Sequence, residues 1–311
     1  MTKKLKQRLA CWLVLVLACC LMGVSLQAQA QDVTPLQVQF VPTSNDPSVD
    51  ERMELLADYL NKALGHQIKV TKATDYSTIV QEMEQSLVDI GIMPPAAYVQ
   101  ARRLGVADAV LTAKLPAYDL ETGQAVPNQT SDSFKAAVIV KADSSIQSLE
   151  DLVGKRVITL HPVSASGYIY PVAELADKGI DVSELDFTIA NDVPEMIQAV
   201  LDGEQDAFFS FQGTRAVFDA AFADHDLFEE LRVIYLSEGD IPNDAIALQP
   251  TMNEELKQQI IDAFKALPET EEGRQIMSLW GHVGYTDTDE AIYDSVEAYI
   301  EAAGRVTPTA Q

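Results

Sequence analysis

Apolar residues along this chain follow two spacings, one typical of strands and one typical of helices, in alternating segments. Residues 36–40 alternate between apolar and polar positions, which is the pattern of a half-buried strand. Between residues 53 and 64 the apolar positions recur every three or four residues, as on one face of a helix, and Gly65 ends that helix. The same succession continues to residue 267, and a last amphipathic helix is expected over 289–303. Strands that alternate with helices predict an α/β fold with mainly parallel strands.

The alternation falls into two units with a polar stretch between them. Residues 117–134 are polar and contain glycine, proline and asparagine, so we expect an exposed loop there. A strand at 136–140 follows, and the alternation starts again with a strand at 157–160. Ligands of open α/β sheets bind beyond the carboxyl ends of the strands. A site is therefore expected in the loops that follow the strands, at residues 42–46, 74–77, 93–98, 161–168, 190–194, 211–214 and 240–244.

The first thirty residues read as a secretory signal peptide. A basic start leads into the apolar run Leu9–Leu26, and Ala28-Gln29-Ala30 then supplies a small-x-small cleavage site. The apolar run is long enough to leave an N-terminal membrane anchor open as a second reading. A lipoprotein cut before Cys19 is a third reading, which ranks lowest because Leu17 is a poor residue at that cut.

Composition removes several classes of function. The three cysteines, Cys11, Cys19 and Cys20, all lie in the signal peptide, so the mature chain has no disulfide and no thiol nucleophile. The formal net charge of −25 argues against nucleic acid and anionic lipid as partners. The four histidines have no ligand-like spacing, and the chain has no nucleophile elbow, phosphate loop or dinucleotide fingerprint. We therefore expect no catalytic residues, no metal site and no cofactor.

The stretch from Val157 to Tyr168 holds the strongest candidate chemistry. A short apolar strand leads into Ser164, Ala165 and Ser166, where a helix is expected to begin. Either serine can cap that helix, and capping alone is the ordinary role of such serines. A helix start also offers free backbone N–H groups and the positive end of the helix dipole. The stretch therefore predicts a site for a small oxyanion.

Four loops in order carry the motifs Thr74-Asp75-Tyr76, Met93-Pro94-Pro95-Ala96-Ala97-Tyr98, Ser164-Ala165-Ser166-Gly167-Tyr168 and Ile241-Pro242-Asn243-Asp244. Together they resemble the periplasmic phosphate/phosphite/phosphonate-binding proteins of ABC importers. No single motif is highly specific, but the ordered set is, and the resemblance covers residues 35–267.

The resemblance implies a two-lobed α/β clamp of the type II periplasmic-binding-protein fold. Residues 1–30 would be the signal peptide, 32–142 plus 242–311 the first lobe, and 143–241 the second lobe. Two crossovers, near 141–145 and 238–243, would form the hinge.

The same resemblance implies ligand-binding roles. Ser164 and Ser166 match two serines that grip the ligand's oxygens. Ala165 stands where the family has a threonine, so one hydroxyl is missing while the backbone N–H remains. A hydrogen bond to a charged group contributes about 1.5–3 kcal/mol, so affinity or ligand choice is expected to differ from the family's.

Three further residues are candidates from the resemblance. Tyr76 would donate its phenol to the anion from the other lobe. Tyr98 is either a ligand contact or a packing group. Asp244 matches an acid that faces the ammonium of aminoalkyl phosphonates, or else only stabilises the turn after Pro242. This chain lacks two features of the relatives. It has no histidine in the loop before the helix at Pro194, and it has no second acid directly after residue 211.

These features predict a periplasmic solute-binding protein that closes on a phosphorus oxyanion (phosphonate, phosphite or phosphate) and delivers it to an ABC permease in the inner membrane. We expect it to act as a monomer. Three alternatives stay open. The clamp could present its ligand to a membrane sensor, or bind another oxyanion such as a sulfonate. An enzyme on the same fold would need a histidine or cysteine set that the chain lacks.

Overall fold

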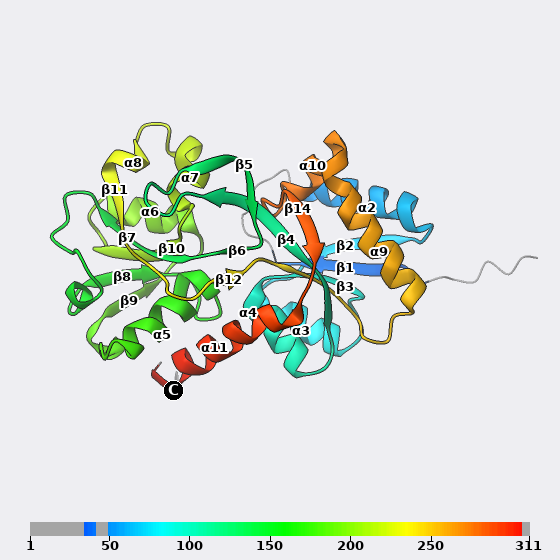
Figure 1. The fold of residues 1–311 in the computed structure, drawn as a ribbon, viewed down its shortest axis with the longest axis horizontal. Helices are drawn as coiled ribbons and strands as arrows, with labels where there is room; N and C mark the ends of the chain where they lie inside the picture. Colours follow the sequence, from blue (N-terminus) through cyan, green and yellow to red (C-terminus); the bar gives the residue numbers. More distant parts are fainter. Residues whose placement is uncertain (1–33, 42–48, 307–311) are drawn as a thin grey trace, which may run out of the picture. The chain divides into compact units, whose positions relative to one another are not determined.

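The computed structural model describes residues 34–41 and 49–306. Within them the chain forms two large β-sheets, each packed between helices (Figure 1). This arrangement confirms the predicted α/β fold. The predicted signal peptide and the loop at 42–46 lie outside the described residues. Among the residues described, no helix combines the length and the apolar character needed to cross a bilayer.

Seven strands form the first sheet: β1 (Leu36–Phe40), β2 (Ile68–Lys72), β3 (Ile90–Met93), β4 (Asp108–Tyr118), β5 (Ala125–Ser131), β13 (Ala245–Leu248) and β14 (Gly284–Asp287). Their order is β14-β4-β13-β3-β1-β2, and β5 pairs with the last part of β4. β1 is parallel to both β2 and β3, whereas β13 lies antiparallel between β3 and β4.

Helices cover both faces of this sheet and complete the first lobe. One face carries α2 (Val49–Leu64), α9 (Glu254–Ala266) and α10 (Glu271–Met277), and the other carries α3 (Tyr76–Glu84) and α4 (Pro95–Arg103) (Figure 1). Leu56 and Leu60 of α2 are fully buried, as their helical spacing predicts. Burial of each such leucine contributes roughly 1.5–3 kcal/mol, so the apolar stripe holds α2 on the sheet.

Five strands form the second sheet: β7 (Ala136–Lys141), β8 (Arg156–Thr159), β9 (Asp186–Ile189), β10 (Ala207–Phe211) and β11 (Leu231–Leu236), in the order β11-β7-β10-β8-β9. On one face lie α5 (Tyr170–Asp177) and the π-helical turn before it, Ala165–Ile169. The other face carries α6 (Val193–Leu201), α7 (Thr214–Phe218) and α8 (Leu227–Glu230). This sheet and its helices are the second lobe. Short 3-10 turns occupy Glu150–Leu152, Val182–Glu184, Asp219–Phe222, Leu267–Glu269 and Glu290–Tyr293.

Two short strands, β6 (Ser133–Phe134) and β12 (Ile241–Pro242), carry the chain between the lobes and pair with each other. The strand after each of them enters a sheet at its carboxyl edge. β13 begins opposite Met93, the last residue of β3, and β7 begins opposite Phe211, the last residue of β10. Both carboxyl edges therefore face the crossovers. Because β13 runs antiparallel to β3 and β7 runs antiparallel to β10, both sheets are mixed. The prediction of mainly parallel strands is therefore wrong.

The structure also corrects the lobe boundary at residue 142. β7 pairs with β10 and β11, so residues 136–141 belong to the second sheet and the first crossover is β6, before the expected 141–145. The second crossover lies within the expected 238–243. Residues 136–140 form a continuous apolar run that is buried on both faces, and such a run does not say which sheet it joins.

The polar stretch 117–134 is not a single loop. It contains the end of β4, all of β5 and β6. Most side chains of β5 are exposed, so no apolar alternation marks it as a strand. Its hairpin reaches the second lobe, where Arg215 donates to the carbonyl oxygen of Thr122 (2.8 Å) and Gln212 donates to that of Tyr118 (3.0 Å).

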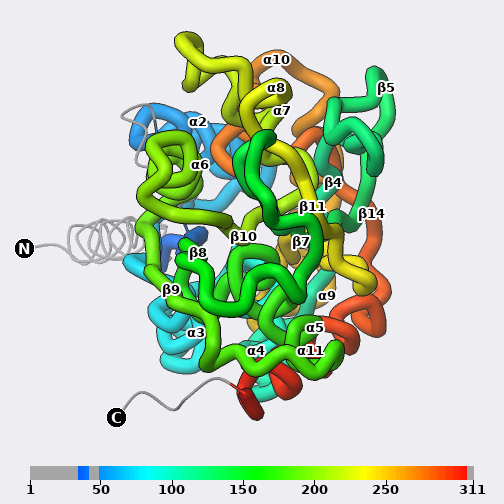
Figure 2. Tube along the Cα trace, turned by 90° about the vertical axis from the view of Figure 1, so that its left-hand side faces the viewer, coloured from blue at the N-terminus to red at the C-terminus, as the bar shows by residue number. Residues whose placement is uncertain are grey.

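The last helix, α11 (Asp294–Val306), packs against both lobes. Val296 lies in the core beside α3 and α4, while Ala303 lies in the core beside α5. The rings of Tyr299 and Tyr170 stack at 3.8 Å with 6° between their planes. Figures 1 and 2 both place α11 alongside α4 and α5. The helix thus links the lobes beside the crossovers.

Glu174 of α5 joins three segments at this place. Its side chain is buried, and Oε1 accepts hydrogen bonds from the backbone N–H groups of Glu238 (2.9 Å) and Gly239 (3.2 Å). The same oxygen accepts from the Tyr299 hydroxyl (2.6 Å), and Oε2 accepts from the Tyr235 hydroxyl (2.8 Å). One carboxylate therefore ties α5 to α11 and to the segment that leads into β12.

Buried tyrosines make this fold sensitive to alkali. Burial raises the pKa of Tyr98 and of Tyr170 to about 12, above the ordinary value of about 10. The neutral phenol is the form that the folded state favours, so this stability is fully present below pH 10 and is lost as the pH rises from about 10 through about 12. We expect the urea midpoint to fall over that interval while phenolate absorbance rises. A constant midpoint up to pH 12 would contradict this expectation.

Candidate anion-binding site

The first turn of α3 places Tyr76 at the carboxyl edge of the first sheet. Asp75 is the N-cap of this helix, and its Oδ1 accepts from the N–H groups of Ser77 and Thr78, both at 2.8 Å. Tyr76 is half-buried, and burial together with the charge of Asp244 raises its pKa to about 12. The phenol is therefore neutral at physiological pH and can donate a hydrogen bond.

The start of α4 lies at the same edge, directly after β3. Pro94 is its N-cap and Pro95 its first residue, so no side-chain oxygen caps the helix. Tyr98 N–H bonds to the carbonyl oxygen of Pro94, whereas the N–H groups of Ala96 and Ala97 have no intrahelical acceptor. These two donors, on residues with small side chains, suit a bound anion.

Ser164 begins the π-helical turn of the second lobe. Its Oγ accepts from Gly167 N–H (3.2 Å), and its carbonyl oxygen accepts from Tyr168 N–H (3.1 Å) and Ile169 N–H (2.9 Å). The predicted capping role of Ser164 is confirmed, and its hydroxyl proton has no acceptor among the residues that the structure describes. Ser166 is half-buried. The N–H groups of residues 165 and 166 open the turn, as those of Ala96 and Ala97 open α4.

Gly167 sets the shape of this turn. A Cβ atom at this position would lie 2.8 Å from Cβ of Leu160, closer than side chains pack. Its carbonyl oxygen accepts from Leu160 N–H (3.3 Å), which draws the turn back over the strand end. The absence of a side chain at residue 167 thus allows the serine turn to sit directly at the end of β8.

Asp244 lies in the short segment between β12 and β13. Its Oδ2 is 3.3 Å from Nε2 of His282, and its backbone carbonyl accepts from Ala113 N–H (2.9 Å). Because residue 245 pairs with Met93, Asp244 lies beside the start of α4. The charge of Asp244 acts on the Tyr76 phenol, and the structure adds His282, which sequence reasoning missed. His282 lies 38 residues away in a loop before β14, where no periodic pattern points to it.

Tyr98 is placed apart from this group. Its side chain is 0% exposed, its hydroxyl accepts from Ala109 N–H (3.2 Å), and its ring meets Tyr293 edge-on at 4.7 Å. Of the two readings of Tyr98, a packing group fits this position.

Replacement of Tyr98 by phenylalanine separates packing from binding. The change leaves Ala109 N–H buried without an acceptor, which costs about 1–3 kcal/mol of unfolding free energy. We expect a lower urea midpoint and an unchanged dissociation constant for the ligand. A weaker ligand affinity in a fully folded variant would return Tyr98 to the site.

The two helix starts share one apolar cluster at the crossovers. Ala96 of α4 and Ala165 of the serine turn both belong to it, together with Phe134 of β6 and Ile241 of β12. The N–H groups at the two helix starts therefore lie near the same crossover strands. Among the described residues, no group of three or more histidine, cysteine or acidic side chains could hold a metal ion.

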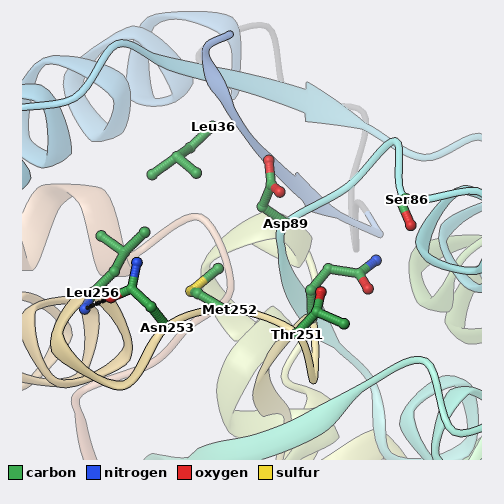
Figure 3. A pocket seen from close by; sticks show the side chains of 8 residues that line it. Leu36, Ser86, Asp89, Thr251, Met252, Asn253 and Leu256 are labelled. Carbon is green, nitrogen blue, oxygen red and sulfur yellow. Dashed lines mark hydrogen bonds between the residues drawn. The ribbon is translucent and has the colours of Figure 1, made fainter. Parts of the chain in front are cut away.

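A hollow of about 290 Å³ lies at a different place (Figure 3). Leu36, Asp89, Met252 and Leu256 are among its lining residues. They stand where β1 begins, just before β3 begins and after β13 ends. This is the amino edge of the parallel strands, so the hollow contains none of the predicted site residues.

Comparison with known proteins agrees with this architecture. The solved structure of a binding-protein component of an ABC phosphonate transporter from Pseudomonas aeruginosa has a TM-score of 0.69 at 19% identity, over 88% of this chain and 87% of that one. PhnD1 from Prochlorococcus marinus, solved in complex with methylphosphonate, has a TM-score of 0.67 at 15% identity, over 87% and 98%. These likenesses define the fold as that of a two-lobed periplasmic binding protein.

Sequence comparison then identifies the family. Residues 38–293 match the model of the phosphonate ABC transporter periplasmic substrate-binding proteins, and the chain belongs to that family. The phosphate-import protein PhnD of Mycolicibacterium smegmatis is 27% identical over 286 residues, which cover 85% of this chain and 84% of that protein. Membership implies a small ligand, a permease in the membrane and a place in the periplasm. The family that the resemblance indicated is thereby confirmed.

Proposed function

We propose that this protein binds a phosphorus oxyanion (a phosphonate, phosphite or phosphate) between its lobes and delivers it to an ABC permease in the inner membrane. The observation that carries the proposal is the pair of helix starts, at Pro95 and at Ala165, which share one apolar cluster with the crossover strands. Each offers backbone N–H groups, and the hydroxyls of Ser164, Ser166 and Tyr76 add to them. The family match supports this ligand class.

Binding relies on neutral donors that are fixed before the ligand arrives. The chain carries a net charge of −25, so its overall field repels an anion and the attraction must be local. Each hydrogen bond to the charged ligand contributes about 1.5–3 kcal/mol. Closure of the lobes then excludes water, which strengthens these bonds. The alanine at position 165 supplies an N–H but no hydroxyl, so the site makes fewer such bonds than one with threonine there.

The proposal also covers the oligomeric state and the location of the protein. The protein acts as a monomer, without catalysis, cofactor or nucleic acid, and reaches the periplasm through a cleaved signal peptide. The same clamp would serve a membrane sensor equally well, and only the partner that it contacts distinguishes the two uses. A sulfonate is the competing ligand, because the same donors would also grip its oxygens.

A thermal-shift panel of the purified protein tests the ligand class. It includes phosphate, phosphite, methylphosphonate, 2-aminoethylphosphonate, sulfate and taurine. A ligand at a hundred times its dissociation constant adds about 2.7 kcal/mol of stability, which is readily seen as a higher melting temperature. We expect at least one phosphorus anion to raise it. A shift with a sulfonate and with no phosphorus anion would show that the ligand class is wrong.

A further inference from the structure

The hairpin of β4 and β5 connects the two lobes at a second place. Asp119 holds its turn, because Oδ1 accepts from the N–H groups of Glu121 (3.1 Å) and Thr122 (2.8 Å). The backbone carbonyl of Asp119 accepts from Gly123 N–H (2.8 Å). Figures 1 and 2 both place this hairpin at the same end of the molecule as α7, whereas α11 lies at the opposite end. The lobes are therefore bridged on two sides, by α11 and by the hairpin.

Close packing at the hairpin bridge depends on Gly213, at the start of α7. A Cβ atom at this position would lie 2.5 Å from the ring of Tyr118, the last residue of β4. The φ angle of Gly213 is −87°, so the contact and not a left-handed backbone requires a glycine. Beside it, the side-chain N–H of Gln212 donates to the Tyr118 carbonyl (3.0 Å), and Oε1 of Gln212 accepts from Lys135 N–H (3.0 Å).

Arg215 brings a buried positive charge to the same contact. The residue is 7% exposed, and its guanidinium carbon lies 4.7 Å from the ring centroid of Phe228. Nη2 donates to the Thr122 carbonyl in the hairpin (2.8 Å), while Nη1 donates to the Leu231 carbonyl in its own lobe (3.0 Å). Among the residues that the structure describes, no carboxylate pairs with this guanidinium and its Nε has no acceptor. Burial accordingly lowers the pKa of Arg215.

These contacts suit a bridge that can form and break. The acceptors on the hairpin are backbone carbonyls, which water satisfies when the hairpin leaves α7. Separation also returns water to the Arg215 guanidinium, whose lost hydration no carboxylate replaces. Hydration therefore offsets part of the hydrogen bonding and ring packing of the docked hairpin. By contrast, α11 is held by apolar core residues such as Val296 and Ala303.

We propose that the β4–β5 hairpin is a latch, which holds the lobes together when it docks on α7 against Gly213 and Arg215. A ligand that binds between the lobes has an apparent affinity equal to its intrinsic affinity times the fraction of molecules whose lobes are together. A change in the latch therefore alters the affinity of every ligand by one common factor. The effect on affinity rests on the proposed binding function, whereas the latch itself can be observed without a ligand.

Replacement of Gly213 by alanine tests the latch by displacing the hairpin. The added Cβ would lie 2.5 Å from the Tyr118 ring, so the hairpin cannot dock, and no hydrogen-bonding group is removed from the second lobe. Small-angle X-ray scattering of the ligand-free variant is expected to give a larger radius of gyration than that of the wild type. Titration calorimetry with methylphosphonate, phosphite and phosphate is expected to give the same loss, about tenfold, for each anion that the wild type binds.

Two further variants and a control sharpen this test. Tyr118→Ala, added to Gly213→Ala, removes the clash and keeps both backbone acceptors of the hairpin, so the radius of gyration and the affinities should return towards the wild type. Arg215→Met keeps an apolar stem but removes the bond to Thr122, so it should separate the lobes as Gly213→Ala does. Gly304→Ala is the matched control, because a Cβ there meets no atom within 4 Å, and it should change neither quantity.

The outcomes separate the latch from the function. If Gly213→Ala has the radius of gyration and the affinities of Gly304→Ala, the latch is wrong. A loss of affinity confined to one of several ligands would also overturn it, since a latch acts on all of them equally. Failure of the wild type to bind any phosphorus oxyanion would instead overturn the proposed function, and scattering of the ligand-free variants would still decide on the latch. Gly213→Ala is decisive even if Arg215→Met does not fold.

Discussion

Replacement of Ser164 and Ser166 together by alanine is expected to weaken phosphorus-oxyanion binding by about a hundredfold or more. Each serine hydroxyl that bonds the charged ligand contributes about 1.5–3 kcal/mol, and every 1.4 kcal/mol is a factor of ten in affinity. The two effects need not add, because the residues are neighbours. Titration calorimetry of the double variant gives the loss directly.

The matched control for this variant is Thr270→Ala. Thr270 caps α10 with the same geometry, since its hydroxyl accepts from Gly273 N–H (2.9 Å), three residues ahead, as that of Ser164 does from Gly167 N–H. Loss of either cap costs about 1 kcal/mol of unfolding free energy. Thr270→Ala should therefore lose stability and keep its affinity. If the double serine variant binds as tightly as this control, the serines act as caps alone.

Replacement of Glu174 by alanine is expected to give the largest loss of stability, of the order of 3 kcal/mol or more. The change leaves two backbone N–H groups, of Glu238 and Gly239, and two tyrosine hydroxyls without their acceptor. Each buried donor left unpaired costs about 1–3 kcal/mol. Urea unfolding at neutral pH measures the effect.

Two variants bracket this result. Glu174→Gln keeps Oε1 for the two N–H groups and presents its amide only to Tyr235, whose hydroxyl can turn to accept, so most stability should remain. Glu184→Ala removes an exposed acid and should change the unfolding free energy by less than about 0.5 kcal/mol. A loss below about 1 kcal/mol in Glu174→Ala would show that this carboxylate does not hold α5, α11 and the crossover together.

Local signals in the sequence were sufficient for the helix starts. Asp75, Pro95 and Ser164 all have side chains or rings that favour the first turn of a helix, so each loop could be predicted without knowledge of its neighbours. The register that brings these loops to the crossovers depends on which strand pairs with which. Residues 136–140 are apolar throughout and would be buried in the sheet of either lobe, so the sequence places the boundary one strand too late.

The parts of the site that escaped prediction depend on contacts between distant segments. His282 meets Asp244 because β14 and β13 both pair with β4, and nothing near residue 282 signals that meeting. Tyr98 has the same local setting as Tyr76, at the start of a helix after a strand. The two tyrosines differ because β4 lies beside Tyr98. The Ala109 N–H of β4 donates to the Tyr98 hydroxyl, which is buried in the core.

An amide NMR titration of the purified protein with methylphosphonate tests whether the two helix starts bind one anion together. If one anion is held by both helix starts, the N–H resonances of Ala96 and Ala97 and those of Ala165 and Ser166 should shift together with a single dissociation constant. Resonances around Leu256, in the hollow at the opposite sheet edge, should stay in place. Shifts confined to that hollow, or to one of the two helix starts, would contradict a shared anion site at the crossovers.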